Sequence, residues 1–498
     1  MSRMSPAKRR VGSRRSASPA SAGLFWLLAG SLLGACAEPK EPAARPPNVV
    51  LVLVDTLRAD RLPFHGGPPE TAPFLARLAE RSVVFENAWS PSSWTLPATV
   101  SILTSVHPFQ HGVTDLVGLE PEPGDEPQPV NCIPPQIETL AEVLAAHGYS
   151  TYGIASNLLV GEAVGFDRGF DRFVQLADEP ADRVNAQVDS WLEEMRKSEP
   201  FFLYLHYFDP HDTFHTREPW FDPPASAKPR GWPDISRPSR DDHFHGDIDW
   251  ILTRVGSLPA DLRGKRAVDM TTEELDRLLE WMRAAYDSEI GYVDDRIGRL
   301  FDELGLEDAV VVFLSDHGEE FYEHGDLTHG QNLYAETVRV PLLVHLPGGI
   351  RAGRVRAPVS TLDVVPTLRR LLGLPPADQD QGLDLFAASA GRAVHGILEG
   401  KSGQHPLEDD MRSIVVNDRR LIEWSGGRVE LFDVADDPWE RDDLASALPA
   451  AVSELRRQLA VMESSAPRFP RTRCDPPPID DALRDRLKAI GYLGEGSD

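Results

Sequence analysis

The strongest constraint on the fold is a series of short apolar runs that alternate with helical stretches. Residues 48–54 (Asn-Val-Val-Leu-Val-Leu-Val) show no polar alternation, which is typical of a parallel strand covered on both faces. Runs of the same texture lie at 150–155, 200–206, 309–314 and 340–346, with helical patterns between them at 72–81, 137–147, 181–196 and 271–304. This alternation predicts an α/β protein with a doubly wound mixed sheet, whose ligands bind beyond the carboxyl ends of the strands.

The texture of the chain changes twice after the first strands. Prolines and three tryptophans (Trp220, Trp232 and Trp250), for which we favour packing over sugar stacking, indicate an insertion at about 213–268 in a catalytic domain spanning 47–374. Beyond it, residues 375–498 predict a smaller α+β subdomain. Its β-rich runs at 413–416, 419–424 and 428–432 are separated by short turns, as in an antiparallel meander, and helices are expected at 449–462 and 480–490.

The N-terminal segment has the pattern of an export signal. Basic residues precede an apolar run at 22–33, which is too short to span a membrane comfortably, and the run ends in Leu33-Gly-Ala-Cys36. That ending resembles a bacterial lipobox, which implies that residues 1–35 are a signal peptide, that Cys36 is lipidated and that residues 36–46 are a proline-rich tether. We therefore expect an exported, membrane-anchored lipoprotein of the cell envelope, in the periplasm or at the cell surface. An uncleaved anchor and a secreted form are the alternatives.

Charge and cysteine content exclude other classes of protein. With 51 Lys and Arg against 78 Asp and Glu the net charge is −27, so no nucleic-acid partner is expected. Three cysteines are too few for a disulfide framework, and we expect that cysteine does not hold the fold together. Pairing of Cys132 with Cys474 and the oligomeric state stay open at this point.

Polar residues that can do chemistry follow the predicted strands. Asp55 directly follows the first strand, where a carboxylate is a natural metal ligand or catalytic group, and Asp316-His317 follow the strand at 309–314, where this adjacent pair can reach one cation. Thr95 precedes Pro97, which suits a first helical turn, and free backbone N–H groups there favour an anionic oxygen. Taken singly, Asp55 or Thr95 is more often a helix cap.

Histidines form a further set of candidates. His211 lies in His-Tyr-Phe-Asp-Pro-His, where the chain leaves the strand at 200–206, and His329 follows in Thr-His-Gly. An ordinary loop with a satisfied histidine is the alternative for His211. Asp209, His211, His215 and His329 could in principle hold a second ion, but no helix is predicted there to bring His211 and His215 together, so one divalent ion is the default.

In this order and spacing the segments resemble the sulfatase family of the alkaline-phosphatase superfamily, from about Pro47 to Leu372. Supporting pieces are Gly165-Phe-Asp-Arg-Gly-Phe-Asp171 and Tyr334-Ala-Glu-Thr-Val-Arg-Val-Pro341. The resemblance implies a metal site made of Asp55, Thr95, Asp316 and His317, with Thr95 as nucleophile. It also implies that His211, His329 and Asn157 face the substrate.

The chain departs from the family pattern at the nucleophile. Where sulfatases carry Cys or Ser in a C/S-x-P-x-R motif, residues 95–99 read Thr-Leu-Pro-Ala-Thr, and threonine cannot become formylglycine. Thr56 replaces the second Asp of the usual pair, and His329 stands where Lys is usual. A threonine nucleophile resembles instead the phosphoethanolamine transferases, lipoteichoic acid synthases and nucleotide pyrophosphatases of the same superfamily.

The functional hypothesis is therefore a metal-dependent hydrolase that cleaves a sulfate or phosphate ester of a small molecule, glycan or lipid through Thr95. The family resemblance implies Ca²⁺, whereas His317 and a threonine oxygen favour Zn²⁺ or Mn²⁺. The alternatives are a phosphotransferase that acts on an envelope lipid or glycan, and a catalytically inactive lipoprotein that kept the fold for binding.

Overall fold

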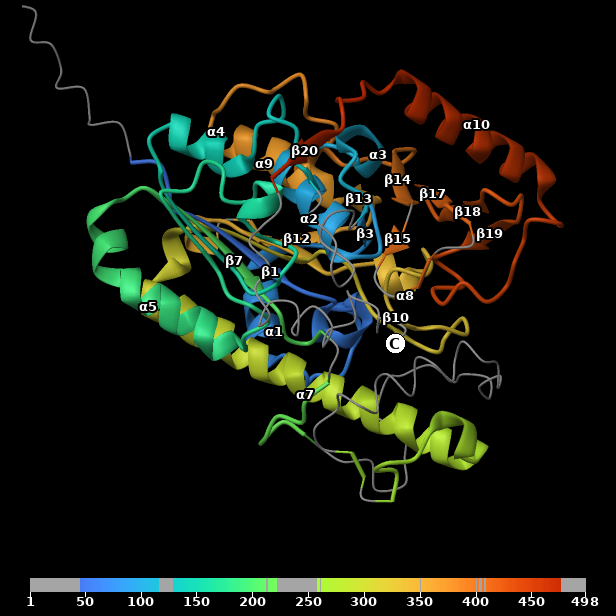
Figure 1. Ribbon diagram of the computed structural model, residues 1–498. Coiled ribbons are helices and arrows are strands. Elements are labelled where there is room, and N and C mark those ends of the chain that lie inside the picture. The colour runs from blue at the N-terminus through green and yellow to red at the C-terminus, as the bar shows by residue number, and fades with distance from the viewer. Residues whose placement is uncertain are drawn as a thin grey trace, which may run out of the picture. The chain divides into compact units, whose positions relative to one another are not determined.

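A computed structural model describes residues 45–115, 129–211, 214–221, 258–259, 261–349, 351–399 and 409–475, with the backbone of strands at 401–402 and 405–406. The chain separates into Met1–Arg45 and a compact unit, Pro46–Asp498, which contains every helix and strand of the described residues (Figure 1). The predicted signal peptide, Cys36, Trp232, Trp250 and the helix at 480–490 lie outside the described residues. In the described part of the chain, no helix is long and apolar enough to cross a membrane.

The centre of the unit is an eight-stranded mixed sheet with the order β12-β2-β11-β8-β1-β7-β5-β6. Strand β1 lies parallel to both β7 and β8, whereas β11 runs antiparallel to β8 and β2. The mixed α/β sheet predicted from the sequence is confirmed. The strands are β1 (Val49–Val54), β2 (Ser82–Phe85), β5 (Ser150–Ala155), β6 (Arg172–Gln175), β7 (Phe201–Tyr207), β8 (Val310–Ser315), β11 (Leu342–His345) and β12 (Gly353–Val355).

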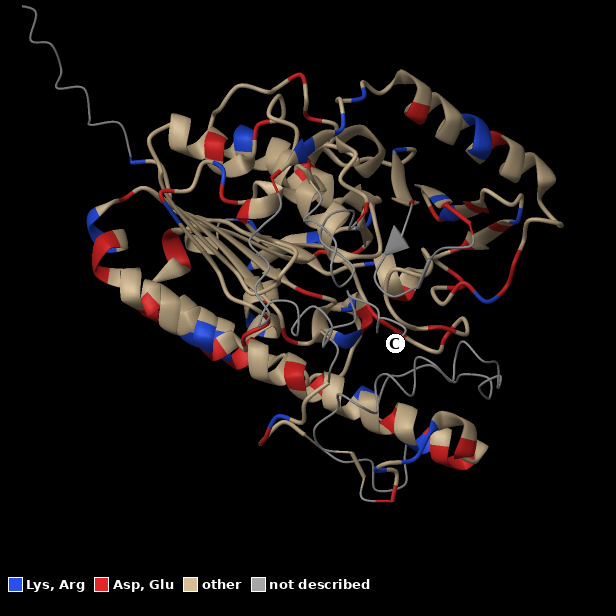
Figure 2. Cartoon of the chain, in the orientation of Figure 1, with Lys and Arg blue, Asp and Glu red and all other residues tan. Residues whose placement is uncertain are grey.

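Helices cover both faces of this sheet, which explains why its central strands lack polar alternation. In β1, Val49, Leu51 and Leu53 pack into one apolar cluster, and the alternate valines pack into another on the opposite face. Strands β1, β7 and β8 carry no Lys, Arg, Asp or Glu, and such residues lie mainly on the outer helices and loops (Figure 2). Burial of both faces therefore selects unbroken apolar runs.

The two layers of helices are distinguished by the clusters they join. Those of the first layer, drawn above the sheet in Figure 1, are α2 (Thr95–Thr104), α4 (Leu140–Ala146) and α9 (Val364–Leu371), and the short α3 (Pro108–His111) contacts α2. Those of the second layer, drawn below, are α1 (Pro73–Glu80), α5 (Ala181–Lys197) and α7 (Thr272–Leu304). The long helix α7 begins with a capping box at Thr271 and ends at Gly305, whose φ of 63° terminates the helix.

The C-terminal part is a four-stranded antiparallel sheet of order β14-β17-β18-β19, against which α10 (Pro449–Ser465) packs through Leu455 and Leu459. Its turns place Asn417 and Gly427 at positive φ, as short hairpin turns require. The predicted meander is confirmed, but β14 was missed because no turn links it to its partner β17. The strands are β14 (Ala393–Leu398), β17 (Met411–Val416), β18 (Arg419–Trp424) and β19 (Val429–Asp433).

Several two-stranded pairings complete the fold. One of them, β9 with β10, is a hairpin in the loop that follows β8 of the central sheet. The pairs are β3 (Ala88–Trp89) with β13 (Val359–Ser360), β4 (Val130–Cys132) with β20 (Thr472–Cys474), β9 (Glu320–Phe321) with β10 (Leu327–Thr328), and β15 (Lys401–Ser402) with β16 (His405–Pro406).

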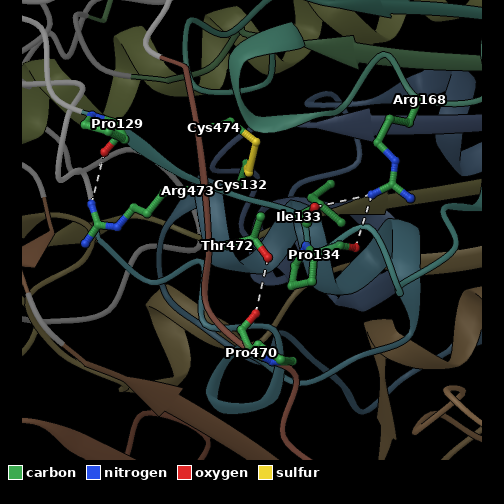
Figure 3. The surroundings of a disulfide bond; sticks show 9 residues. All are labelled: Pro129, Cys132, Ile133, Pro134, Arg168, Pro470, Thr472, Arg473 and Cys474. Atoms are coloured by element: carbon green, nitrogen blue, oxygen red, sulfur yellow. Dashed lines mark hydrogen bonds between the residues drawn. A yellow bond between two sulfur atoms is a disulfide. The ribbon is translucent and has the colours of Figure 1, made fainter.

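A disulfide bond joins Cys132 to Cys474 across 342 residues of sequence (Figure 3). The two cysteines lie on β4 and β20, which pair antiparallel, so the segment after α10 is fastened to the catalytic domain. The expectation that cysteine does not hold the fold together is therefore wrong for this pair. It failed because the two strands become neighbours only when the chain returns across the domain, and no local pattern records that.

Candidate active site

The site lies where β1 and β8 end. These parallel neighbours are in register at Val54 and Ser315, so the next residues, Asp55 and Asp316, emerge side by side at the carboxyl edge of the sheet. Both carboxylates are fully buried. The strand pattern of the sequence predicted this convergence, because parallel strands bring their carboxyl ends to one edge.

Asp55, Asp316 and His317 offer three ligand atoms within 4.8 Å of one another. The His317 Nε2 atom lies 3.4 Å from Asp55 Oδ1 and 3.6 Å from Asp316 Oδ2. Among the described residues, these two buried oxygens have no hydrogen-bond partner. Buried anionic oxygens that protein donors leave unsatisfied, beside an imidazole nitrogen, fit a divalent cation.

The electrostatics of the three groups agree with that fit. Burial, and then the neighbouring Asp55, raise the pKa of Asp316 well above its usual value, while burial lowers the pKa of His317 well below its own. The His317 Nδ1 atom lies 2.9 Å from the carbonyl oxygen of Gly318, which accepts its proton. The neutral ring therefore presents an unprotonated Nε2 toward the carboxylates, as a metal ligand must.

Thr95 is brought to the same point by α2. It is the first residue of that helix, it is fully buried, and its Oγ1 lies 3.2 Å from His317 Nε2. The position at a helix N-terminus predicted from Pro97 is confirmed. The first turn of α2 leaves backbone N–H groups that can stabilise an anionic oxygen beside this hydroxyl.

Two groups behind Asp55 hold its second oxygen. Asn157 Nδ2 donates to Asp55 Oδ2 at 2.7 Å, while its own Oδ1 accepts the Leu159 N–H at 2.8 Å, so the amide orientation is fixed. His206, which the sequence analysis did not single out, is fully buried with Nε2 at 3.7 Å from the same oxygen. Burial lowers the pKa of His206 to about 4. Asn157, predicted to face the substrate, thus lies against a carboxylate of the Asp55, Asp316 and His317 cluster.

His329 and His211 line one side of the cluster. The ring centroids of His317 and His329 are 4.5 Å apart, and those of His329 and His211 are 4.8 Å apart. His211 stacks on Phe208 at 4.4 Å, and His329 Nδ1 lies 3.0 Å from Glu319 Oε1. The structure therefore brings both predicted histidines to the site, and adds Glu319, whose place two residues after His317 was the only signal for it.

Of the four residues considered for a second ion, His211 and His329 come together, but Asp209 and His215 do not join them. Asp209 accepts the Ala181 N–H at 2.8 Å and an Arg217 N–H at 2.6 Å, so it caps α5 and pairs with a cation. His215 is exposed, and its backbone conformation is not helical. Thr56, at the position of the second Asp of the usual pair, is buried and has a φ of 53°.

Comparison with known proteins decides the family. The profile of the sulfatase family matches residues 47–374, about two thirds of the chain. The chain belongs to the sulfatase family. It is accordingly a hydrolase of the sulfuric and phosphoric ester class, and its cluster of two aspartates and a histidine lies where this hydrolase brings Thr95 to the sheet edge.

Relatives of this sulfatase-family hydrolase differ in their named activities. It is 27% identical over 372 residues to a choline-sulfatase of Rhizobium meliloti (strain 1021). That alignment covers 66% of this chain and 68% of the relative. It is 26% identical to the multifunctional alkaline phosphatase superfamily protein PehA of Trinickia caryophylli, over 66% and 74% of the two chains. The phosphonate monoester hydrolase of Agrobacterium radiobacter shares the fold, with a TM-score of 0.65 at 19% identity over 84% and 96%.

Proposed function

We propose that this hydrolase cleaves a sulfate or phosphate ester with Thr95 as nucleophile and one divalent cation held by Asp55, Thr95, Asp316 and His317. The observation that carries the proposal is convergence on one point. Thr95 Oγ1, Asp55 Oδ1 and Asp316 Oδ2 lie 3.2, 3.4 and 3.6 Å from His317 Nε2, and all four side chains are fully buried.

A divalent cation at this position would lower the pKa of the Thr95 hydroxyl and neutralise the non-bridging oxygens of the ester. Thr95 Oγ gives up its proton to solvent water and attacks the sulfur or phosphorus atom, and the bond to the ester oxygen breaks as the new bond forms. The first turn of α2 supplies backbone N–H groups for the negative charge of the group in transit. Water then attacks the sulfur or phosphorus atom of this covalent ester and gives up a proton. The bond to Thr95 Oγ breaks, and the threonine oxygen takes up a proton again.

The leaving oxygen needs a proton, and His329 and His211 are the groups that can supply it. With Glu319 Oε1 at 3.0 Å as acceptor for Nδ1–H, the Nε2 atom of His329 is left for the substrate. His211 is oriented by its stacking on Phe208. After giving up this proton, His329, which stands in place of the usual lysine, can accept a proton from the attacking water in the second step.

The donor set bears on the metal. Two carboxylates and a threonine oxygen suit Ca²⁺ and Mg²⁺, while the imidazole of His317 favours Zn²⁺ or Mn²⁺. We propose that a single ion is bound, because two of the residues considered for a second ion do not reach it. Asp209 is hydrogen-bonded to other groups, and His215 is exposed.

The proposal is tested by steady-state hydrolysis of matched aryl esters: a sulfate, a phosphate monoester, a phosphodiester and a phosphonate monoester. Metal-stripped enzyme is compared with enzyme given Ca²⁺, Zn²⁺ or Mn²⁺. Thr95→Ala should lose at least about 10³-fold in kcat, whereas Thr95→Ser should retain measurable turnover, because a hydroxyl is kept. Equal activity in Thr95→Ala and wild type would exclude the threonine nucleophile. A covalent ester on Thr95 without turnover in water would identify a transferase that lacks its acceptor.

We further propose that the protein is an exported lipoprotein anchored through Cys36 to the membrane of a bacterial cell envelope. The Cys132–Cys474 disulfide supports export, because such bonds persist in oxidising compartments. Metabolic labelling with a palmitate analogue in the full-length chain and in Cys36→Ser tests this. Label lost in Cys36→Ser is expected, and equal labelling of both would exclude the anchor.

A further inference from the structure

A set of buried polar contacts lies on the chain segment that carries two residues of the proposed site. This segment, residues 318–334, begins beside His317 and includes Glu319 and His329. Between them the β9 and β10 hairpin carries His324, whose Nδ1 lies 2.5 Å from Glu336 Oε1 and whose Nε2 lies 3.1 Å from the carbonyl oxygen of Glu440. Glu440 belongs to the C-terminal part of the chain, just after β19.

The partners of His324 determine its protonation. A carbonyl oxygen only accepts, so Nε2 must carry a proton, and the Glu336 carboxylate makes Nδ1 a donor as well. The ring is then an imidazolium, and it has no lone pair for a metal, although Glu320, His324 and Glu336 lie close enough together to suggest one.

The other charged groups around the ring keep it protonated. Glu320, Glu323, Asp326, Glu336 and Glu440 are acids of this region, and Tyr334 stacks on the ring at 3.6 Å between centroids. Burial alone would lower the pKa of His324, but Glu336 and Glu320 raise it to about 10. The His324 ring therefore keeps its positive charge at neutral pH.

The C-terminal part also forms hydrogen bonds at the C-terminal end of the segment 318–334. Glu440 Oε2 accepts the N–H of Ala335, the first residue of α8 (Ala335–Val338), at 2.9 Å. Arg420 on β18 pairs with the same carboxylate at 2.5 Å and donates to the carbonyl oxygen of Leu333.

Backbone hydrogen bonds connect these polar contacts to the proposed site. The N–H of Glu319 donates to the Glu336 carbonyl oxygen at 3.0 Å, and the N–H of Gly318 donates to that of Thr337 at 2.8 Å. A Cβ atom on Gly318 would lie 2.0 Å from the same Glu336 oxygen, so the two backbones approach as closely as glycine allows. Glu336 thus contacts His324 with its side chain and Glu319 with its backbone.

We propose that His324 is a positioning residue, an imidazolium strut that ties the segment 318–334 to the C-terminal part and thereby holds Glu319 and His329 beside the metal cluster. The inference rests on the proposed function, in which His329 protonates the leaving oxygen. It makes the C-terminal part a component of the active site, although none of the proposed metal ligands comes from it.

The test compares full-length wild type with His324→Gln, Glu440→Gln and the control His147→Gln. His147 is exposed, and the bond that its ring forms is to Val143 of its own helix. Removing the strut should lower kcat for an alkyl ester, a poor leaving group, about tenfold or more, with less than about a threefold loss for a nitrophenyl ester and KM nearly unchanged. Metal affinity should stay within about threefold of wild type, because Asp55, Asp316 and His317 are untouched. An equal loss for both esters would indicate general damage and overturn the proposal.

Two readouts do not depend on turnover. By nuclear magnetic resonance, the His324 ring in wild type should stay doubly protonated at pH 8, and a ring that loses a proton below pH 8 would refute the strut. Amide hydrogen exchange in residues 318–334 should accelerate at least about tenfold in His324→Gln and stay unchanged in His147→Gln. If wild type hydrolyses no ester, the proposed function fails, while these two measurements still decide whether His324 holds the segment.

Discussion

Replacement of Asp316 by Asn should stabilise the metal-free protein and reduce the stabilisation that metal binding adds. In the metal-free protein, Asp55 and Asp316 present buried carboxylate oxygens within 4.8 Å of each other. Two full charges at that distance repel by about 3 kcal/mol at an effective dielectric constant of about 20. Protonation of one carboxyl relieves part of this repulsion, so we expect Asp316→Asn to stabilise the metal-free protein by about 1–3 kcal/mol.

The stabilisation gained from metal binding should fall. At a metal concentration about 1000 times Kd, binding adds about 4 kcal/mol to the free energy of unfolding of wild type. If the loss of one carboxylate ligand weakens binding a hundredfold, the same concentration adds only about 1.4 kcal/mol. The Asn side chain still has an Oδ1 that can accept the His317 N–H, a bond of 2.9 Å in wild type, so the local backbone is preserved.

The measurement is urea unfolding of metal-stripped protein and of protein titrated with Ca²⁺, Zn²⁺ or Mn²⁺, with affinity from calorimetry. Asp308→Asn, at an exposed position, is the matched control and should change stability by less than about 0.5 kcal/mol under both conditions. The reasoning fails if metal-free Asp316→Asn is less stable than wild type. It fails equally if the metal stabilises the variant as much as it stabilises wild type.

Two further predictions concern stability away from the cluster. His111 is buried, accepts the Val113 N–H at Nδ1 and bonds Ser101 Oγ through Nε2, and burial lowers its pKa to about 3. Because the unfolded chain binds this proton below about pH 6.5 and the folded chain does not, stability should fall by about 1.4 kcal/mol per pH unit from pH 6.5 toward pH 3. In His111→Gln the acid limb of urea unfolding should be shallower by that slope, and an unchanged limb would contradict the assignment. Cys474→Ser opens a covalent loop with a sequence separation of 342 and should cost about 2–5 kcal/mol in unfolding free energy, a loss that a reductant reproduces in wild type but does not add to in the variant.

The cluster of Asp55, Asp316 and His317 was predictable because its members lie at strand ends. Asp55 and Asp316 each follow an unbroken apolar run, and the register of β1 with β8 then leaves little freedom in where the two carboxylates go. Thr95 was predictable for a similar reason, since Pro97 marks the start of α2. In each case a local pattern determines the backbone, and the backbone determines where the side chain emerges.

Groups that act through a distant partner left no such pattern. His206 sits inside an apolar strand run, and only the pairing of β1 with β7 places it beside Asp55. Glu440 follows β19 among several other acidic residues, and nothing local distinguishes it from those at the surface. Asn157 was assigned to the substrate by resemblance, whereas the folded chain turns its amide onto Asp55.

The sequence by itself determined the sheet, its two covered faces and the ends of the strands where the chemistry lies, because burial on both faces demands unbroken apolar runs and parallel strands end at one edge. The tertiary structure alone decided which groups support that chemistry. The bond between Cys132 and Cys474, the pairing of Glu319 with His329 and the contact of His324 with Glu440 join segments whose proximity is created by packing. Such contacts depend on how whole layers pack against one another, and hydrophobic periodicity in the sequence contains no information about that packing.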